Sequence, residues 1–192
     1  DKKQYVKKSS FSAYTLLTEN HLVPVFGNQY TIEETEVQQF VFQKIEQGLS
    51  HKTIKDILIV LKMVLKFGAK NKWLEYQAFD IQFPTEREKY EIEVLSRANQ
   101  KKVMNYIQEH FTFRNLGIFI CLSAGIRIGE VCALTWEEID TDRGIISIKR
   151  TIQRIYVIED NIRKTEVILD TPKTKNSIRK IPMSRDLLRM LK

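Results

Sequence analysis

Residues 124–140, AGIRIGEVCALTWEEID, hold the most specific pattern in this 192-residue chain. Gly125 is suited to a tight turn, and we expect Arg127 to open a short helix directly after it. Glu130 follows three residues later, which places its carboxylate on the same helical face as the guanidinium. The apolar residues that come next, together with Trp136, predict that this helix is anchored in a hydrophobic core.

The composition indicates a folded, basic protein. Hydrophobic residues make up 43% of the chain, which is enough for packed cores and excludes global disorder. The formal net charge is +7, and residues 143–192 alone hold 13 Lys and Arg against 5 Asp and Glu. A basic region of this kind favours a polyanionic partner, and a solvated basic face is the alternative.

The cysteines and the hydropathy pattern indicate a cytoplasmic protein. Neither Cys121 nor Cys132 has a second Cys or a His at metal-ligand spacing. We therefore expect two small buried side chains in a reducing, cytoplasmic compartment, and no metal site. The longest apolar run, residues 116–126, is too short to cross a bilayer, and the first residues show no signal segment.

Residues 1–81 are expected to fold as a helical bundle. Ser9 or Ser10 can cap a first helix, and Thr35 starts a capping box for a second. Ser50 opens a long third helix that runs to about residue 70 and carries its apolar residues on one side.

Residues 82–93 are polar and charged and contain Pro84, which predicts an interdomain linker. The second unit, residues 94–192, begins with helices. After Asp140, β-branched runs separated by turn-like residues predict short antiparallel strands. The expected fold class is therefore mainly α with a small antiparallel β-sheet.

A second motif lies at residues 171–182, TPKTKNSIRKIP, where turn-forming residues carry Lys173 before a short strand. Together with residues 124–140, in this order and at this separation, it resembles the first catalytic segments of the tyrosine recombinases (phage-type integrases), the second being a Lys-bearing β-hairpin. Nearly the whole chain is similar to that family. The extended β region at residues 151–170 is most similar to integrases of conjugative transposons.

The resemblance implies a function and an organisation. Residues 1–81 would be a helical, SAM-like core-DNA-binding domain, and residues 94–192 the first part of a mixed α+β catalytic domain. The full enzyme would excise and integrate a mobile element in a prokaryotic cytoplasm, bound at the nucleoid. A 3′-phosphotyrosyl intermediate conserves bond energy, so no cofactor is expected. The implied partners are double-stranded DNA, from element ends and target, and other recombinase protomers, four in the synapse.

The resemblance also implies roles for three side chains. Arg127 corresponds to the first catalytic arginine, whose guanidinium pairs with phosphate oxygens. Glu130 would support it by fixing its rotamer, and Lys173 would act as general acid towards the leaving 5′ oxygen. The alternatives are an ordinary surface ion pair between Arg127 and Glu130, and an exposed turn lysine.

The later catalytic residues of that family are not found after Lys173. They comprise a His-x-x-Arg pair, a further His or Trp, and the nucleophilic Tyr, whereas every His and Tyr of this chain precedes Lys173. We therefore expect a C-terminally truncated fragment of a longer enzyme, inactive alone.

Basic and hydroxyl side chains on several segments are candidate DNA contacts. On the long helix, lysines fall within a sector of about 80°, opposite the apolar stripe. Helix starts add hydroxyl and N–H groups suited to phosphate, and the β region adds further cations. The candidates are Lys8, Ser9, Ser10, Ser50, Lys52, Thr53, Lys55, Lys62, Lys66, Lys149, Arg150, Arg154, Lys175 and Arg179. A solvated lysine face is the alternative for the helix.

Three other functions share part of this pattern. A non-catalytic DNA-binding module would make the same DNA contacts without cutting. A type IB topoisomerase would use similar chemistry without a site preference. A helical interaction protein would not bind duplex DNA.

Binding of duplex DNA is expected to weaken steeply with salt, because Lys and Arg dominate the candidate contacts. If about six phosphates are neutralised, the logarithm of the affinity falls against the logarithm of the salt concentration with a slope of about −5. Titrations at several salt concentrations measure this slope. A nearly flat response would exclude a clamp formed by the two domains around a duplex.

Overall fold

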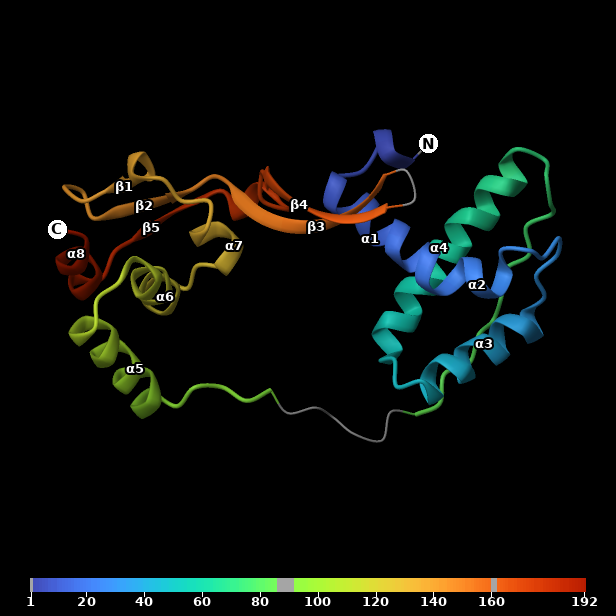
Figure 1. Ribbon diagram of the computed structural model, residues 1–192, viewed down its shortest axis with the longest axis horizontal. Helices are drawn as coiled ribbons and strands as arrows, with labels where there is room; N and C mark the ends of the chain where they lie inside the picture. Colours follow the sequence, from blue (N-terminus) through green and yellow to red (C-terminus); the bar gives the residue numbers. More distant parts are fainter. Residues whose placement is uncertain (1, 86–91, 160–161) are drawn as a thin grey trace. The chain divides into compact units, whose positions relative to one another are not determined.

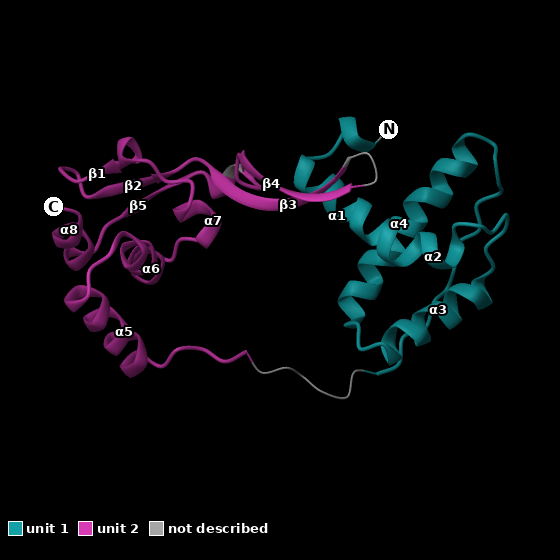
Figure 2. Ribbon diagram, viewed as in Figure 1, with its two compact units in different colours: residues 1–90 teal, residues 91–192 magenta. Residues whose placement is uncertain are grey.

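The computed structural model describes residues 2–85, 92–159 and 162–192 (Figure 1). The chain divides into two units, residues 1–90 and 91–192 (Figure 2), and each has a hydrophobic core of its own. The observed fold is mostly helical with small antiparallel sheets, which confirms the predicted fold class. In the part of the chain that the structure describes, no helix is long and apolar enough to span a membrane.

The first unit is a helical bundle, in which the longest helix packs against the one before it. Val37, Phe40 and Val41 of one helix and Ile54 and Ile57 of the next are almost fully buried in its core. The elements are η1 (Lys2–Gln4), α1 (Lys8–Leu17), η2 (Thr18–Leu22), α2 (Val23–Phe26), α3 (Glu34–Glu46) and α4 (His51–Lys70).

The helix starts agree only in part with the prediction. Ser50 caps α4, and its hydroxyl accepts a hydrogen bond from the Thr53 N–H at 3.1 Å. For α3 the predicted capping box at Thr35 is wrong, because Glu33 adopts the extended cap conformation and forms the box with Glu36. The predicted cap at Ser9 or Ser10 is also wrong, since α1 begins at Lys8 and both serines lie in its first turn.

An extended segment follows α4 and packs back against α3. The Gln82 backbone exchanges two hydrogen bonds with the Gln38 side chain, at 2.8 and 2.9 Å, and the Asp80 N–H donates to Glu34 at 2.9 Å. Phe83 packs against the core of this unit. Gln82 and Phe83, assigned to the linker by sequence, are thus held on the first unit, and linker residues 86–91 lie outside the described residues.

The second unit combines helices with two separate antiparallel sheets. Its core is formed by Phe119, Ile146, Ile148 and Leu187, which are almost fully buried. The helices are α5 (Arg97–Glu109), α6 (Phe113–Ala124), α7 (Ile128–Val131), η3 (Trp136–Glu138), η4 (Lys175–Ser177) and α8 (Arg185–Leu191). The strands are β1 (Ile139–Asp140), β2 (Ile145–Ile148), β3 (Thr151–Glu159), β4 (Ile162–Asp170) and β5 (Arg179–Pro182).

The sheet pairing determines where the second motif lies. One sheet has the order β1-β2-β5, with Ile148 opposite Arg179 at its edge, whereas β3 and β4 form a separate two-stranded sheet. The prediction that Lys173 lies on a β-hairpin is therefore wrong, because the strands on either side of it do not pair with each other. Lys173 lies in the loop from β4 to β5, and this loop connects two sheets instead of two paired strands.

Replacement of Ile57 by Ala should destabilise the first unit alone. Ile57 is fully buried, so the substitution leaves a cavity that is expected to lower the free energy of unfolding by about 2–5 kcal/mol. Amide hydrogen exchange measures the effect, with faster exchange expected in α3 and α4 and unchanged exchange in α6 and β2. An equal loss of protection in both units would show that their cores do not unfold independently.

Candidate functional site

One buried carboxylate connects the two sequence motifs of the second unit. Glu130 of α7 has only 3% of its side chain exposed. Its Oε1 and Oε2 accept hydrogen bonds from Nη1 and Nη2 of Arg179 at 3.0 and 2.9 Å. They also accept from Nη1 of Arg127 at 3.2 Å and from the Arg127 backbone N–H at 3.1 Å. Two arginines, one from each motif, thus meet on the same carboxylate.

Two glycines place the backbone that carries Arg127. Gly125 ends α6 in the left-handed conformation at φ 62°, as expected for a tight turn. Gly129 lies against the start of β3, where a Cβ atom would come within 2.7 Å of the Ile152 carbonyl oxygen and of Thr151 Oγ1. A side chain at position 129 would therefore push α7 away from β3, and Arg127, which precedes α7 directly, would move with it.

The helix α7 begins one residue later than predicted, so Arg127 precedes it instead of opening it. Arg127 is the N-cap of α7, in an extended conformation, and α7 is only four residues long. The backbone N–H of Arg127 is not free to bind an anion, because it donates to the Glu130 carboxylate. The predicted pairing of Arg127 with Glu130 is observed.

The two arginines on Glu130 differ in exposure. The Arg127 side chain is 73% exposed, whereas that of Arg179 is 28% exposed. Glu130 takes a single guanidinium N–H of Arg127, which leaves other donors for a ligand. The guanidinium of Arg127 is therefore accessible to a ligand and is held in place by a buried carboxylate, a geometry that suits pairing with an oxyanion.

Glu130 is held in its ionised form. The hydrogen bonds from Arg179 lower the pKa of this carboxyl, burial acts in the opposite direction, and the Arg127 N–H lowers the pKa further. The same contacts with Glu130 raise the pKa of Arg179. An ionised, acceptor-only carboxylate can orient donors but cannot donate a proton, which fits a supporting role.

A second buried Glu–Arg pair lies a short distance along the chain. Glu138 forms a capping box with Thr135 and pairs with Nη2 of Arg150 at 3.1 Å. Burial raises the pKa of Glu138, but the hydrogen bonds from Arg150 and from the Thr135 N–H outweigh it, and the pKa is lowered. Sequence reasoning missed this pair, although the Thr-x-x-Glu spacing is a recognisable capping signal.

These two pairs change the expected DNA contacts. Arg150 and Arg179 were predicted to bind phosphate, but both guanidinium groups are engaged by buried glutamates. Lys149 and Arg154 are exposed, and Nη1 of Arg154 lies 3.5 Å from the Thr165 hydroxyl on the neighbouring strand. The side chain of Lys175 lies outside the described part of the chain.

The loop that carries Lys173 is tied to the same cluster. Lys173 is exposed and is preceded by the buried Pro172. The Ser177 N–H donates to the Thr174 carbonyl at 3.0 Å, and the two hydroxyl groups lie 2.9 Å apart. The Ser177 carbonyl in turn accepts from Nη1 of Arg179 at 3.0 Å, which links the loop to Glu130.

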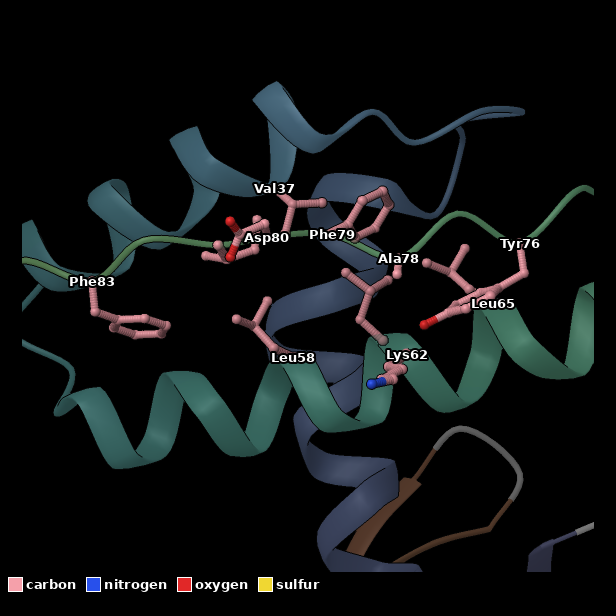
Figure 3. Close-up of a pocket in the computed structure, with 11 residues that line it drawn as sticks. Val37, Leu58, Lys62, Leu65, Tyr76, Ala78, Phe79, Asp80 and Phe83 are labelled. Atoms are coloured by element: carbon pink, nitrogen blue, oxygen red, sulfur yellow. The ribbon is translucent and has the colours of Figure 1, made fainter.

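In the first unit, the predicted lysine face of α4 is exposed. Two of its lysines lie over aromatic rings of the extended segment: Lys55 over Phe83 at 5.1 Å and Lys66 over Tyr76 at 5.4 Å. Figure 3 shows Lys62 near this segment, where it lines a cavity of about 300 Å³. The four predicted lysines, which include Lys52, thus stay at the surface, two of them held by cation–π contacts.

The helix starts contribute less than expected. The Thr53 N–H and the Ser50 hydroxyl are already used in the cap of α4, where the two hydroxyl groups lie 2.9 Å apart. At the start of α1, Lys8 is exposed, whereas Ser9 and Ser10 are half-buried.

Comparison with known proteins adds the decisive observation, since the model of the phage integrase family matches residues 93–192. The chain belongs to the phage integrase family. This match includes α7, the loop of Lys173 and β5, and so covers every residue of the Glu130 cluster.

Two curated relatives extend the similarity into the first unit. The chain is 31% identical over 169 residues to a tyrosine recombinase XerC-like protein of Caldanaerobacter subterraneus, covering 84% of this chain and 42% of that protein. It is 23% identical over 168 residues to the transposase from transposon Tn916 of Enterococcus faecalis, covering 84% and 39%. The chain therefore spans about two fifths of the length of these relatives.

Solved structures of the Tn1549 transposon integrase show the same fold. An integrase of transposon Tn1549, in complex with transposon right end DNA, superimposes with a TM-score of 0.72 at 22% identity, covering 97% of this chain and 58% of that one. A second complex of the same integrase, with circular intermediate DNA, gives a TM-score of 0.73 at 23% identity.

Replacement of Glu130 by Gln should produce a loss of stability that depends on pH. Because the pKa of Glu130 is lowered on folding, its contribution is fully present above the unfolded-chain pKa of about 4.3 and is lost as the pH falls through the folded value. At neutral pH the variant should lose up to about 3–5 kcal/mol, since a buried pair is broken.

Denaturant unfolding at neutral pH and at pH values below about 4 measures this difference. Glu137→Gln is the matched control, because Glu137 is exposed on the same segment and the substitution changes the net charge equally. A loss of stability in Glu130→Gln that stays constant across this pH range would contradict the ionised assignment.

Proposed function

We propose that this chain is the DNA-binding and first catalytic part of a site-specific tyrosine recombinase that excises and integrates a mobile element. The observation that carries the proposal is the accessible guanidinium of Arg127 on the buried Glu130–Arg179 pair. Strand cleavage builds negative charge on the non-bridging phosphate oxygens. A guanidinium that is already oriented stabilises this charge without reorganisation during the reaction.

Lys173 and Glu130 have different roles in this proposal. Lys173 is exposed in a loop attached to the Glu130 cluster, where its ammonium group can donate a proton to the leaving 5′ oxygen. Glu130 is buried and ionised, so it orients Arg127 and takes no part as a nucleophile. The 3′-phosphotyrosyl intermediate would form on the nucleophilic tyrosine of the complete recombinase, and no cofactor is needed.

The proposed partner is double-stranded DNA from element ends and target. Support comes from the exposed lysines of α4 in the first unit, which we propose as the core-DNA-binding domain over residues 1–81. Lys8, Lys149 and Arg154 are further proposed phosphate contacts, and residues 94–192 form the proposed first part of the catalytic domain. Other protomers, four in the synapse, are the second proposed partner.

The mobile element is proposed from the relatives. One of them is the Tn916 transposase, another is the ICEBs1 integrase of Bacillus subtilis, and the Tn1549 integrase was solved with transposon DNA. Because the chain spans about two fifths of such relatives, cleavage should be measured on the protein translated from the complete reading frame.

Arg127→Ala should reduce cleavage by about 10²–10³-fold and leave DNA binding nearly intact. Removal of one preorganised donor to a developing oxyanion lowers the rate by about 10²–10³-fold, whereas one phosphate contact among many contributes little to affinity. Cleavage of duplexes taken from either side of the gene, and affinity for the same duplexes, are the two measurements.

Arg143→Ala is the matched control, because Arg143 is an exposed arginine of the same unit in a weak ion pair with Asp140 at 3.8 Å. It should leave the cleavage rate unchanged. An equal loss of binding and cleavage in Arg127→Ala would refute the role of Arg127. A wild-type protein that binds these duplexes and never cuts them would favour the non-catalytic DNA-binding module.

A further inference from the structure

We propose that Arg179 is a positioning residue that holds Arg127 and the loop of Lys173 in one fixed arrangement. It acts through two acceptors, the Glu130 carboxylate and the Ser177 carbonyl. The inference rests on the proposed function, because it concerns how the two groups proposed for catalysis are placed relative to each other.

The first support is the geometry of the pair with Glu130. The two arms of the Arg179 guanidinium meet the two carboxylate oxygens at 3.0 and 2.9 Å, in a bidentate contact that fixes the carboxylate plane. Arg127 also contacts both oxygens, through Nη1 at 3.2 Å and its backbone N–H at 3.1 Å, but these contacts are longer and stay within one helical turn. Arg179 is the residue that attaches this carboxylate, the acceptor for Arg127, to a distant strand, β5.

The second support is the contact of Arg179 with the loop. Nη1 of Arg179 is shared between Glu130 and the Ser177 carbonyl, both at 3.0 Å. Ser177 closes a turn onto Thr174, the residue directly after Lys173. On the other side of Lys173, Pro172 is buried. The backbone on both sides of Lys173 is thus fixed, and one of the two attachments leads to Arg179.

The third support is that Arg179 itself is held by the sheet. It is the first residue of β5 and lies opposite Ile148 of β2, whose side chain is almost fully buried. The Arg179 side chain is only 28% exposed, so the neighbouring side chains on the core side of the sheet limit its movement. Because Arg179 is fixed in this way, its contacts hold two otherwise separate segments at a defined distance from each other. These segments are the cap of α7 and the loop before η4.

The test uses Arg179→Lys in the full-length protein. Lysine keeps the positive charge, but it has one compact ammonium group and cannot make the bidentate contact while also reaching Ser177. DNA affinity should stay within about threefold of wild type, because the charge is retained. The cleavage rate should fall by about 10–100-fold, because displacement of catalytic groups by about 1 Å has effects of that size.

A second readout follows the placement directly and does not depend on cleavage. Amide hydrogen exchange should accelerate together in residues 126–132 and 171–178 of Arg179→Lys, whereas a purely structural role would accelerate exchange throughout the unit. Arg150→Lys is the matched control, since it weakens the other buried pair, with Glu138, and Arg150 contacts Thr135 in place of the Lys173 loop. This control should leave exchange in residues 171–178 unchanged.

Glu130→Gln is the second variant, in case Arg179→Lys does not fold. It keeps the size of the side chain, removes the charge that Arg179 contacts, and should accelerate exchange in the same two segments. In the Glu130→Gln background, Arg179→Lys should reduce the cleavage rate little further, because both changes break one linkage.

The outcomes separate this inference from the proposed function. Unchanged exchange in residues 171–178 of Arg179→Lys, or a cleavage rate within twofold of an active wild type, would overturn the positioning role. A wild-type protein that binds DNA and never cleaves it would overturn the proposed function, and the exchange data would still decide whether Arg179 couples the two segments.

Discussion

The burial of one ionised carboxylate, Glu130, constrains several elements of the second unit at once. Glu130 is almost inaccessible to solvent, and a charge in that position is tolerated only when its oxygens are paired and hydrogen-bonded. The chain meets this requirement by bringing Arg179 from a strand 49 residues away and by turning Arg127 back onto the same group. The position of α7, the edge of β5 and the turn before it therefore depend on one another. Buried ion pairs add little net stability compared with apolar side chains of similar volume, so this cluster specifies an arrangement more than it adds free energy of folding.

The same device occurs a second time in the segment between α6 and β1. Glu130 and Glu138 are both third residues of a short helical turn, both cap that turn, and both receive an arginine from outside it. The close contact of Gly129 with β3 adds a third fixed point, directly before Glu130. A segment attached at these points has few ways to move, and this explains how an exposed side chain such as Arg127 can have a defined direction. Preorganisation of this kind is what a group needs if it is to stabilise a developing charge.

The sequence predicted those features that depend on local patterns. The helical first unit, the Ser50 cap of α4 and the strands after Asp140 follow from periodicity and capping chemistry, which involve residues close in sequence. The pairing of Arg127 with Glu130 was predictable for the same reason. The partners of Arg150 and Arg179 were not, because an arginine in a basic segment has the same sequence signature whether it faces solvent or a buried carboxylate from another element. Sheet pairing was missed in a similar way: β4 precedes β5 directly in the chain, but β5 pairs with β2.

In the proposed DNA interface, the residues that attract the DNA differ from the residue that would orient a phosphate. Arg150 and Arg179 are each neutralised by a buried glutamate, so they add little to the field around the protein. The exposed lysines of α4 are compact charges on flexible stems, which attract a polyanion without fixing its angle. Arg127 differs from them, since its guanidinium is planar, accessible and supported from beneath by an ion pair. In the proposed interface the lysines would therefore provide salt-sensitive affinity, and Arg127, which the fold holds in place, would orient a phosphate. Loss of a surface lysine and loss of an arginine in this cluster are physically different changes, although each removes one positive charge.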